Sequence, residues 1–252
     1  METPIIMIIS LLFIFNLFAE PIPIGAKKLI DNYPGIVTYY KENHIYFKDG
    51  TSMIYDDKKS KTKDQLINQP DIEDMFTFNY FVGNLKENPN NDAGRIRNDL
   101  FFKKIYGGSA TQVRNNLITV NWCPKLIGQK ILVTKTNQVY KQIEKISKEL
   151  DEFPEFKDYL IKIGGTFNWR VINGTTRLSM HSFGMTIDIN TKYSDYWQWS
   201  CNCTNENIAI KGYKNRIPLK IVSVFEKHGF IWGGKWEHFD TMHFEYRPEL
   251  VY

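Results

Sequence analysis

The chain has 252 residues, of which 42% are hydrophobic and 24% charged, a composition typical of a globular protein with one core or a core plus a smaller section. The formal net charge is +4 at pH 7, and the basic residues are scattered along the sequence. This charge is too small and too unpatterned for a nucleic-acid-binding protein, so we expect no nucleic-acid partner.

An apolar run extends from Pro4 to Ala19. It is short for a membrane span and has the length of a signal-peptide core. We therefore predict that residues 1–19 are a signal peptide, that the protein is exported to the periplasm or cell envelope, and that no stable membrane anchor remains. The fit is imperfect, because Glu2 and no Lys or Arg precede the run. A retained anchor or a buried N-terminal element is the alternative.

The chain contains three cysteines: Cys123, Cys201 and Cys203. An odd number in an exported protein indicates one disulfide and one free thiol. Because a ring closed by Cys-x-Cys is strained, we expect Cys123 to pair with Cys201 or Cys203. Three reduced cysteines are the alternative.

Residues 33–55 alternate apolar and polar side chains around Asp49 and Gly50, which predicts a β-hairpin. A cluster of three carboxylates follows: Asp71, Glu73 and Asp74. We interpret this cluster as an exposed helix start, where carboxylates are favourable, with a metal cluster as the alternative.

Two helices are predicted further along the chain. Within residues 136–154, four apolar side chains fall on one helical face and Pro154 ends the pattern; they are Val139, Ile143, Ile146 and Leu150. The second helix runs from about Pro218 to His228, with Gly229 as its C-terminal cap.

Three short segments between and after the helices are strand-like: residues 165–172, 184–190 and 243–246. The sequence has few predicted helices and several predicted strands, and these do not alternate as βαβ units. This order predicts an α+β fold, with a small antiparallel sheet and flanking helices. We place a domain over residues 131–252 and treat residues 20–130 as an N-terminal section of unknown role.

The residues that suggest chemistry lie in two short stretches of this domain. His181 and Asp188 come from "SMHSFGMTID", and Asp240 and His243 come from "DTMHFE". Two imidazoles and one carboxylate (His181, His243 and Asp188) are a recurrent ligand set for catalytic zinc, which keeps a position open for water. Asp240 would supply the base that a zinc hydrolase needs.

Glycines in both stretches fit a compact site. Gly184 can bend the chain between His181 and Asp188, which would otherwise face opposite sides of a flat strand. Gly233 and Gly234 can let the chain fold tightly behind Asp240 and His243.

Together the two stretches resemble the Ser-x-His-x-x-Gly-x-Ala-x-Asp and Glu/Asp-x-x-His motifs of the zinc D-alanyl-D-alanine peptidases of the VanX/VanY type. That family also includes L-alanyl-D-glutamate endopeptidases and shares its fold with the Hedgehog proteins. "GTFNWRVINGTTRLSMHSFG" and "GFIWGGKWEHFDTMHFE" resemble its carboxypeptidase-like branch. Thr186 replaces the usual Ala, and Asp240 stands where the dipeptidase branch has Glu.

The resemblance implies zinc on His181, Asp188 and His243, and a catalytic base at Asp240. It also implies an arginine upstream of the first motif that holds substrate; Arg170 matches best, with Arg177 in reserve. Arg177, Ser179 and Trp236 complete the candidate substrate-binding residues. Ser179 is not a candidate nucleophile, because the sequence shows no pattern of a base and a residue that orients it. For Trp236, aromatic packing is the alternative to substrate binding.

We therefore predict a zinc peptidase that hydrolyses peptidoglycan stem peptides, of the D-Ala-D-Ala carboxypeptidase or L-Ala-D-Glu endopeptidase type. A non-catalytic, zinc-stabilised cell-wall binding module is the alternative. A further alternative gives ligand or base roles to Glu237 and His238, whose spacing does not match the motif.

Overall fold

The computed structural model describes residues 21–83, 91–203, 205–206, 210 and 212–252, so the predicted signal peptide lies outside the described residues. Within those residues, no helix is both long and apolar enough to cross a membrane. The N-terminal section contains α1 (Ile24–Asn32), β1 (Val37–Lys41), β2 (His44–Phe47), β3 (Ser52–Ile54), α2 (Lys63–Asn68), the 3-10 helix η1 (Glu73–Phe76), α3 (Asp99–Tyr106) and α4 (Ala110–Asn115).

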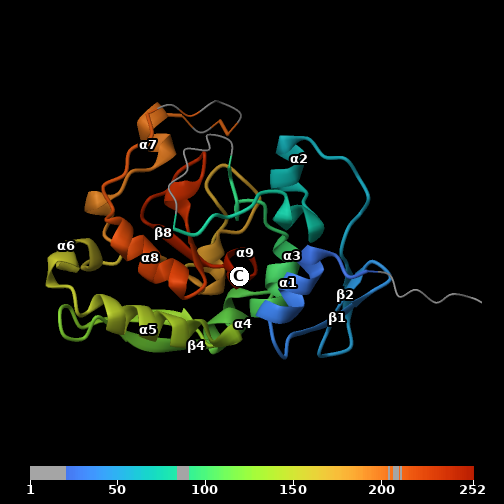
Figure 1. Cartoon of the computed structure of the whole chain (residues 1–252), viewed down its shortest axis with the longest axis horizontal. Coiled ribbons are helices and arrows are strands. Elements are labelled where there is room, and N and C mark those ends of the chain that lie inside the picture. The colour runs from blue at the N-terminus through green and yellow to red at the C-terminus, as the bar shows by residue number, and fades with distance from the viewer. Residues whose placement is uncertain (1–20, 84–90, 204, 207–209, 211) are drawn as a thin grey trace, which may run out of the picture.

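Strands β1, β2 and β3 form an antiparallel sheet in that order, at the right of Figure 1. The predicted hairpin is confirmed, because Asp49 and Gly50 lie in the turn between β2 and β3. A second turn, between β1 and β2, was not predicted. Glu42 and Asn43 form it in the left-handed region, with φ of 49° and 58°, so no glycine marks it in the sequence.

Two carboxylates of the acidic cluster at residues 71–74 pair with one lysine. Lys61 Nζ lies 2.8 Å from Asp71 Oδ2 and 2.5 Å from Asp74 Oδ2, and only 6% of the lysine side chain is exposed. Asp71 Oδ1 accepts a hydrogen bond from the backbone N–H of Asp74 at the start of η1. The carboxylates thus begin a helix, as predicted, but it is a short 3-10 helix, and Asp74 is buried where an exposed start was expected.

The middle of the chain is a long hairpin covered by a helix. β4 (Leu117–Trp122) pairs antiparallel with β5 (Gln129–Thr134), and α5 (Val139–Leu150) packs on β4 (Figure 1). α5 confirms the first predicted helix, and all four apolar residues of its predicted face are buried. Short helices flank this unit: η2 (Thr136–Gln138), η3 (Pro154–Phe156) and α6 (Lys157–Leu160).

The second predicted helix is confirmed as α8 (Leu219–Lys227). Pro218 is its N-terminal cap, and Gly229 follows it with a φ of +82°, a conformation that favours glycine. The remaining helices are η4 (Met180–Phe183), η5 (Thr191–Tyr193), α7 (Trp197–Cys201), η6 (Gly233–Lys235) and α9 (Pro248–Val251).

The third sheet has β8 (His243–Tyr246) in its centre, with β6 (Thr186–Asp188) on one side and β7 (Phe230–Trp232) on the other, all antiparallel. The strands predicted within 184–190 and at 243–246 are confirmed, and so is the α+β class. The strand predicted at 165–172 is wrong, since this segment forms only isolated bridges. Ser182 Oγ accepts a hydrogen bond from the Arg170 N–H and donates one to the Arg170 carbonyl oxygen, which also accepts from the Ser179 N–H. A side chain thus takes the place of a neighbouring strand at the Arg170 N–H.

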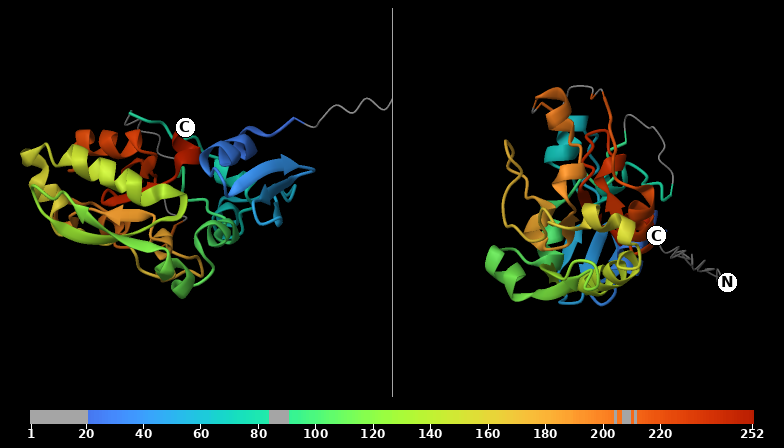
Figure 2. Two further views of the ribbon diagram at one scale, coloured as in Figure 1. Left: turned by 90° about the horizontal axis from the view of Figure 1, so that it is seen from below. Right: turned by 90° about the vertical axis from the view of Figure 1, so that its left-hand side faces the viewer.

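The N-terminal section and the third sheet are packed together. α1 lies against α9 (Figure 2), and the Tyr33 hydroxyl donates a 2.8 Å hydrogen bond to Glu249. One large apolar core includes side chains of both parts. Ile131 lies within β5, so the β4–β5 ladder crosses the predicted division at residue 131. That division stays a prediction.

The predicted pairing of Cys123 is wrong. Cys201 forms a disulfide with Cys203 at the end of α7, where Asn202 between them adopts a left-handed φ of 49° that turns the two cysteines together. Cys123 is free and fully buried, with its Sγ 3.7 Å from the carbonyl oxygen of Ser147. Burial raises the pKa of this thiol to about 12, so it stays protonated and acts as a core residue.

Candidate metal and catalytic site

Three of the predicted site residues lie close together beside the paired strands β6 and β8. His181 Nε2 lies 3.1 Å from Asp188 Oδ2, and His243 Nδ1 lies 3.0 Å from Asp188 Oδ1. One donor atom from each of the three residues lies within 4.8 Å of the others. Both histidines are buried, whereas 20% of the Asp188 side chain is exposed, so the cluster can be reached from solvent.

Local geometry explains how the two stretches meet. Gly184 ends η4 in a left-handed conformation with a φ of +64°, and so turns the chain between His181 and Asp188, as predicted. Asp188 then pairs directly with His243 across the β6–β8 ladder. The short spacing within each motif and the register of β6 against β8 therefore bring the three side chains together.

Asp240 is held beside this cluster by its own backbone. Its N–H donates a 3.0 Å hydrogen bond to the carbonyl of Gly233, and it forms an isolated bridge with Tyr196. A Cβ on Gly233 would lie 2.6 Å from the Asp240 carbonyl oxygen, so the predicted tight fold does require glycine there. Asp240 Oδ1 is buried and has no hydrogen-bond partner among the described residues.

The charges of the cluster act strongly on one another. Burial and then the Asp188 carboxylate raise the pKa of Asp240 to about 6. Although burial opposes the effect, His181 and His243 hold the pKa of Asp188 well below its usual range. Burial lowers the pKa of His243, but hydrogen bonds to Asp188 and Glu245 outweigh this effect and raise the pKa to about 10.

The residues present fit a metal ion. Two imidazole nitrogens and a carboxylate are a donor set that zinc prefers, and three protein ligands leave a fourth position open. The unpartnered buried Oδ1 of Asp240 is an independent sign, because a buried carboxylate oxygen is costly without a partner. The other ring nitrogen of each histidine also has an acceptor: Thr166 O for His181 and Glu245 Oε2 for His243.

Glu245 was missed by the sequence reasoning. Its signal was available in "HFE", because residues two apart on a strand point to the same side of the sheet. Its Oε2 lies 3.3 Å from His243 Nε2.

The two candidate arginines lie in different surroundings. Arg170 is exposed, and its guanidinium contacts only the carbonyl of Val171, at 3.4 Å, among the hydrogen bonds of the described residues. Arg177 is largely buried and lies 2.8 Å from Glu206, which also pairs with Arg95. Tyr196 forms an isolated backbone bridge with Asp240, and burial and then the Asp240 carboxylate raise the pKa of Tyr196 to about 12.

The other candidate substrate-binding residues are mostly enclosed. Ser179 is 5% exposed and precedes η4. Trp236 is 7% exposed, and its Nε1 donates a hydrogen bond to the carbonyl of Ala93. The Trp236 ring lies 5.5 Å from the His243 ring, so it packs beside a candidate ligand. Direct contact of either residue with substrate stays a prediction.

Glu237 and His238 do not join the cluster. His238 lies with Asp92, and its two ring nitrogens contact the Asp92 carboxylate at 3.0 Å and the Glu206 carbonyl at 2.9 Å. Glu237 pairs with Lys63 at 2.6 Å. Asp92, Glu237 and His238 are close enough to form a second group of possible ligands, but both His238 nitrogens are already in use.

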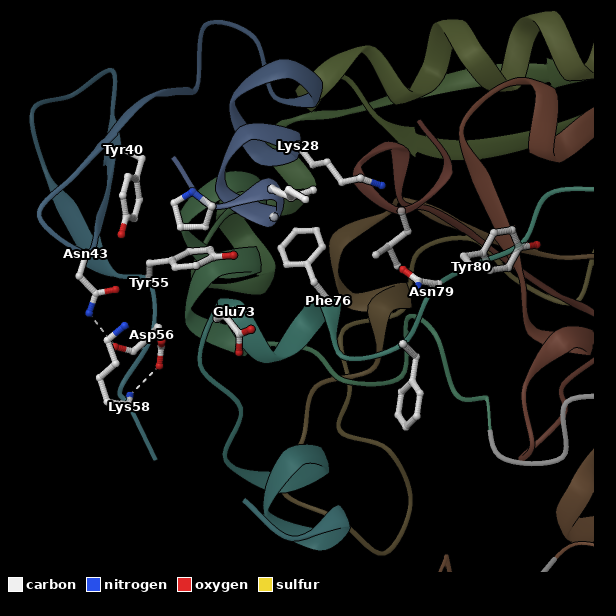
Figure 3. Close-up of a pocket in the computed structure, with 15 residues that line it drawn as sticks. Lys28, Tyr40, Asn43, Tyr55, Asp56, Lys58, Glu73, Phe76, Asn79 and Tyr80 are labelled. Atoms are coloured by element: carbon white, nitrogen blue, oxygen red, sulfur yellow. Dashed lines mark hydrogen bonds and ion pairs between the residues drawn. The ribbon is translucent and has the colours of Figure 1, made fainter. Parts of the chain in front are cut away.

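A cavity of about 440 Å³ lies elsewhere, on the N-terminal section (Figure 3). Aromatic rings, including Tyr55 and Phe76, line it together with Lys28 and Glu73, and none of the predicted site residues does. The candidate site is therefore identified by its chemistry, and not by the size of a cavity.

An open two-histidine, one-carboxylate cluster beside a spare carboxylate is the site type of metal-dependent hydrolases. Residues 173–246 match the family described as D-alanyl-D-alanine carboxypeptidase, which confirms the resemblance noted in the sequence and supports a peptidase. The match covers less than a third of the chain but includes His181, Asp188, Asp240 and His243. No curated protein and no solved structure matches the chain.

Proposed function

We propose that this protein is a zinc-dependent peptidase that hydrolyses peptide bonds in peptidoglycan stem peptides, of the D-Ala-D-Ala carboxypeptidase or L-Ala-D-Glu endopeptidase type. The observation that carries the proposal is the convergence of His181, Asp188 and His243 next to Asp240, inside the segment that matches the carboxypeptidase family. Export to the periplasm or cell envelope, where this substrate lies, is part of the proposal.

His181 Nε2, His243 Nδ1 and the Asp188 carboxylate would hold the zinc ion. When bound there, zinc would polarise the scissile carbonyl and bring the pKa of a coordinated water down to about 7. The free carboxylate oxygen of Asp240 would accept the proton of the attacking water and then deliver it to the leaving amine. Arg177 or Arg170 would hold a carbonyl or carboxylate of the substrate through its guanidinium fork. No covalent enzyme intermediate is required.

A zinc-stabilised binding module remains the competing function, and Asp240 argues against it. A structural zinc site is normally closed by four protein ligands. Such a site gives no reason to bury a further carboxylate oxygen that has no partner.

Purified muropeptides provide the test. We expect the protein to cleave them, a chelator to stop cleavage, and added zinc to restore it, with mass spectrometry identifying the bond that is cut. Changing both His181 and His243 to Ala should abolish zinc binding and cleavage together. Tight zinc binding without any cleavage would favour the binding module, and full zinc occupancy in the double variant would refute the ligand assignment.

A further inference from the structure

The carboxylate of Glu245 connects His243 to two arginines. One oxygen, Oε2, lies 3.3 Å from His243 Nε2 and 2.7 Å from Arg97 Nη2, and the other, Oε1, lies 3.0 Å from Arg247 Nη1. Glu245 and Arg247 are fully buried, and only 11% of the Arg97 side chain is exposed. Both oxygens of a fully buried carboxylate are thus in use.

The position of Glu245 determines which nitrogen of His243 is available. Nδ1 faces Asp188 and the proposed metal position, whereas Nε2 faces Glu245. An acceptor at Nε2 selects the tautomer that keeps its proton there and leaves Nδ1 as the donor to a metal. At His181 the corresponding acceptor is the neutral Thr166 carbonyl, 3.0 Å from Nδ1. A carboxylate strengthens the imidazole as a ligand more than a carbonyl does, because its negative charge raises the basicity of the ring.

Glu245 depends in turn on the N-terminal section. A fully buried carboxylate is costly unless it is paired, and Arg97, from the chain before α3, supplies one of its two partners. The Arg97 guanidinium also lies 5.5 Å from the centre of the Trp236 ring, which flanks His243. Arg247 continues the network to Glu249, which accepts the hydrogen bond from Tyr33.

We propose that Glu245 is a positioning residue that orients His243 for metal binding, and that Arg97 of the N-terminal section fixes Glu245 in place. The proposal rests on the proposed function, since it concerns the same metal site. It gives the N-terminal section a defined role: this section supplies part of the support of the metal centre.

The test measures zinc affinity by chelator competition, on the full-length protein, with urea unfolding as a check of the fold. Glu245→Gln should weaken zinc binding by about 10- to 100-fold. The matched control is Glu249→Gln, which takes an equally buried carboxylate away from Arg247 without touching His243, and should leave zinc affinity close to wild type.

Further variants separate positioning from folding. Glu245→Asp keeps the charge that the arginines need but withdraws the carboxylate from Nε2, so it should fold and still bind zinc more weakly. Arg97→Gln should weaken zinc binding in the same direction, and Arg97→Lys should restore much of it. Equal weakening by Glu245→Gln and Glu249→Gln, or wild-type affinity in both Glu245 variants, would overturn this inference alone. A wild-type protein without zinc affinity would instead overturn the proposed function and this inference with it.

Discussion

Asp240 differs from the other carboxylates of the site because one of its oxygens is buried and has no hydrogen-bond partner within the described part of the chain. Asp188 is shared by two histidines, and Glu245 by a histidine and two arginines. The free oxygen suits a group that exchanges protons with substrate and water, because it is not committed to holding another side chain.

Asp240→Asn keeps the shape of the side chain and removes the base. We expect zinc content and folding to stay near wild type while the rate of muropeptide cleavage falls by about a hundredfold or more. Glu237→Gln is the control, since Glu237 pairs with Lys63 outside the cluster, and it should be nearly silent. Loss of zinc in Asp240→Asn would mean that Asp240 is a ligand, and unchanged turnover would place the base elsewhere.

The arginine that holds substrate can be identified by paired substitutions. Because Arg177 is largely buried and held by Glu206, whereas Arg170 is exposed, we expect Arg177→Lys to lower turnover far more than Arg170→Lys. Zinc content should be unchanged in both variants. The reverse order of effects would return the role to Arg170, which the sequence motif favours.

At the scale of elements, the turn between η4 and β6 decides whether His181 can reach Asp188. Gly184 has a φ of +64°, and a Cβ there would lie 2.6 Å from Leu117 Cδ2 on β4. Gly174 has a similar φ of +77°, but nothing lies within 4 Å of its Cβ position. The two glycines therefore share the backbone conformation and differ in the space around them.

Gly174→Ala should lower the free energy of unfolding by about 1 kcal/mol, the cost of a left-handed alanine. Gly184→Ala adds a steric clash to this strain, and should cost about 1 to 3 kcal/mol more. It should also weaken zinc binding, because the clash moves η4. Denaturant unfolding and chelator competition measure the two effects. Equal stability of the two variants would show that the contact with Leu117 adds no cost to the shared backbone strain.

Local patterns predicted much of this architecture. The apolar face of α5, the cap at Gly229 and the turn at Asp49–Gly50 are properties of a few adjacent residues, so the sequence alone was sufficient for them. The segment at 165–172 looks like a strand locally, but the Arg170 N–H bonds the Ser182 side chain in place of a neighbouring strand. Such a contact between distant residues leaves no periodic signal in the sequence.

The candidate site likewise combines features that local patterns predict with contacts that they do not predict. The ligands lie in two short motifs, and their spacing is a property of each motif. Arg97 lies 148 residues before its partner Glu245, and no local pattern relates them. The cysteine pairing was missed for a different reason: the left-handed conformation of Asn202, which joins Cys201 to Cys203, is uncommon outside glycine.

For the whole molecule, Asp92 links the N-terminal section to the loop that carries Asp240. It is fully buried and contacts both Arg95 and His238. Burial opposes ionisation, but the Arg95 charge and the His238 hydrogen bond hold the pKa of Asp92 well below its usual range. A carboxylate whose pKa is lowered by folding stabilises the protein above the unfolded pKa of about 4, and this contribution is lost as the pH falls further.

We therefore expect the free energy of unfolding to fall as the pH drops below about 5, and Asp92→Asn to make that fall smaller. Asp31→Asn is the control, because Asp31 is exposed on α1 and its ion pair with Lys27 should contribute little. Urea unfolding at several pH values checks this. If Asp92→Asn left the pH dependence unchanged, protonation of Asp92 would not be the cause of the loss of stability at low pH.

The hydrogen bond between Tyr33 and Glu249 joins residues 216 positions apart. The central strand of the third sheet, β8, is also the last strand of the described chain, and it carries His243 and Glu245. During synthesis, α1 emerges long before α9, so the surface of α1 that packs on α9 has no partner until residues 248–251 follow. Contacts between residues this far apart in the sequence slow folding. The metal site therefore cannot assemble before β8, which carries His243, is available to pair with β6.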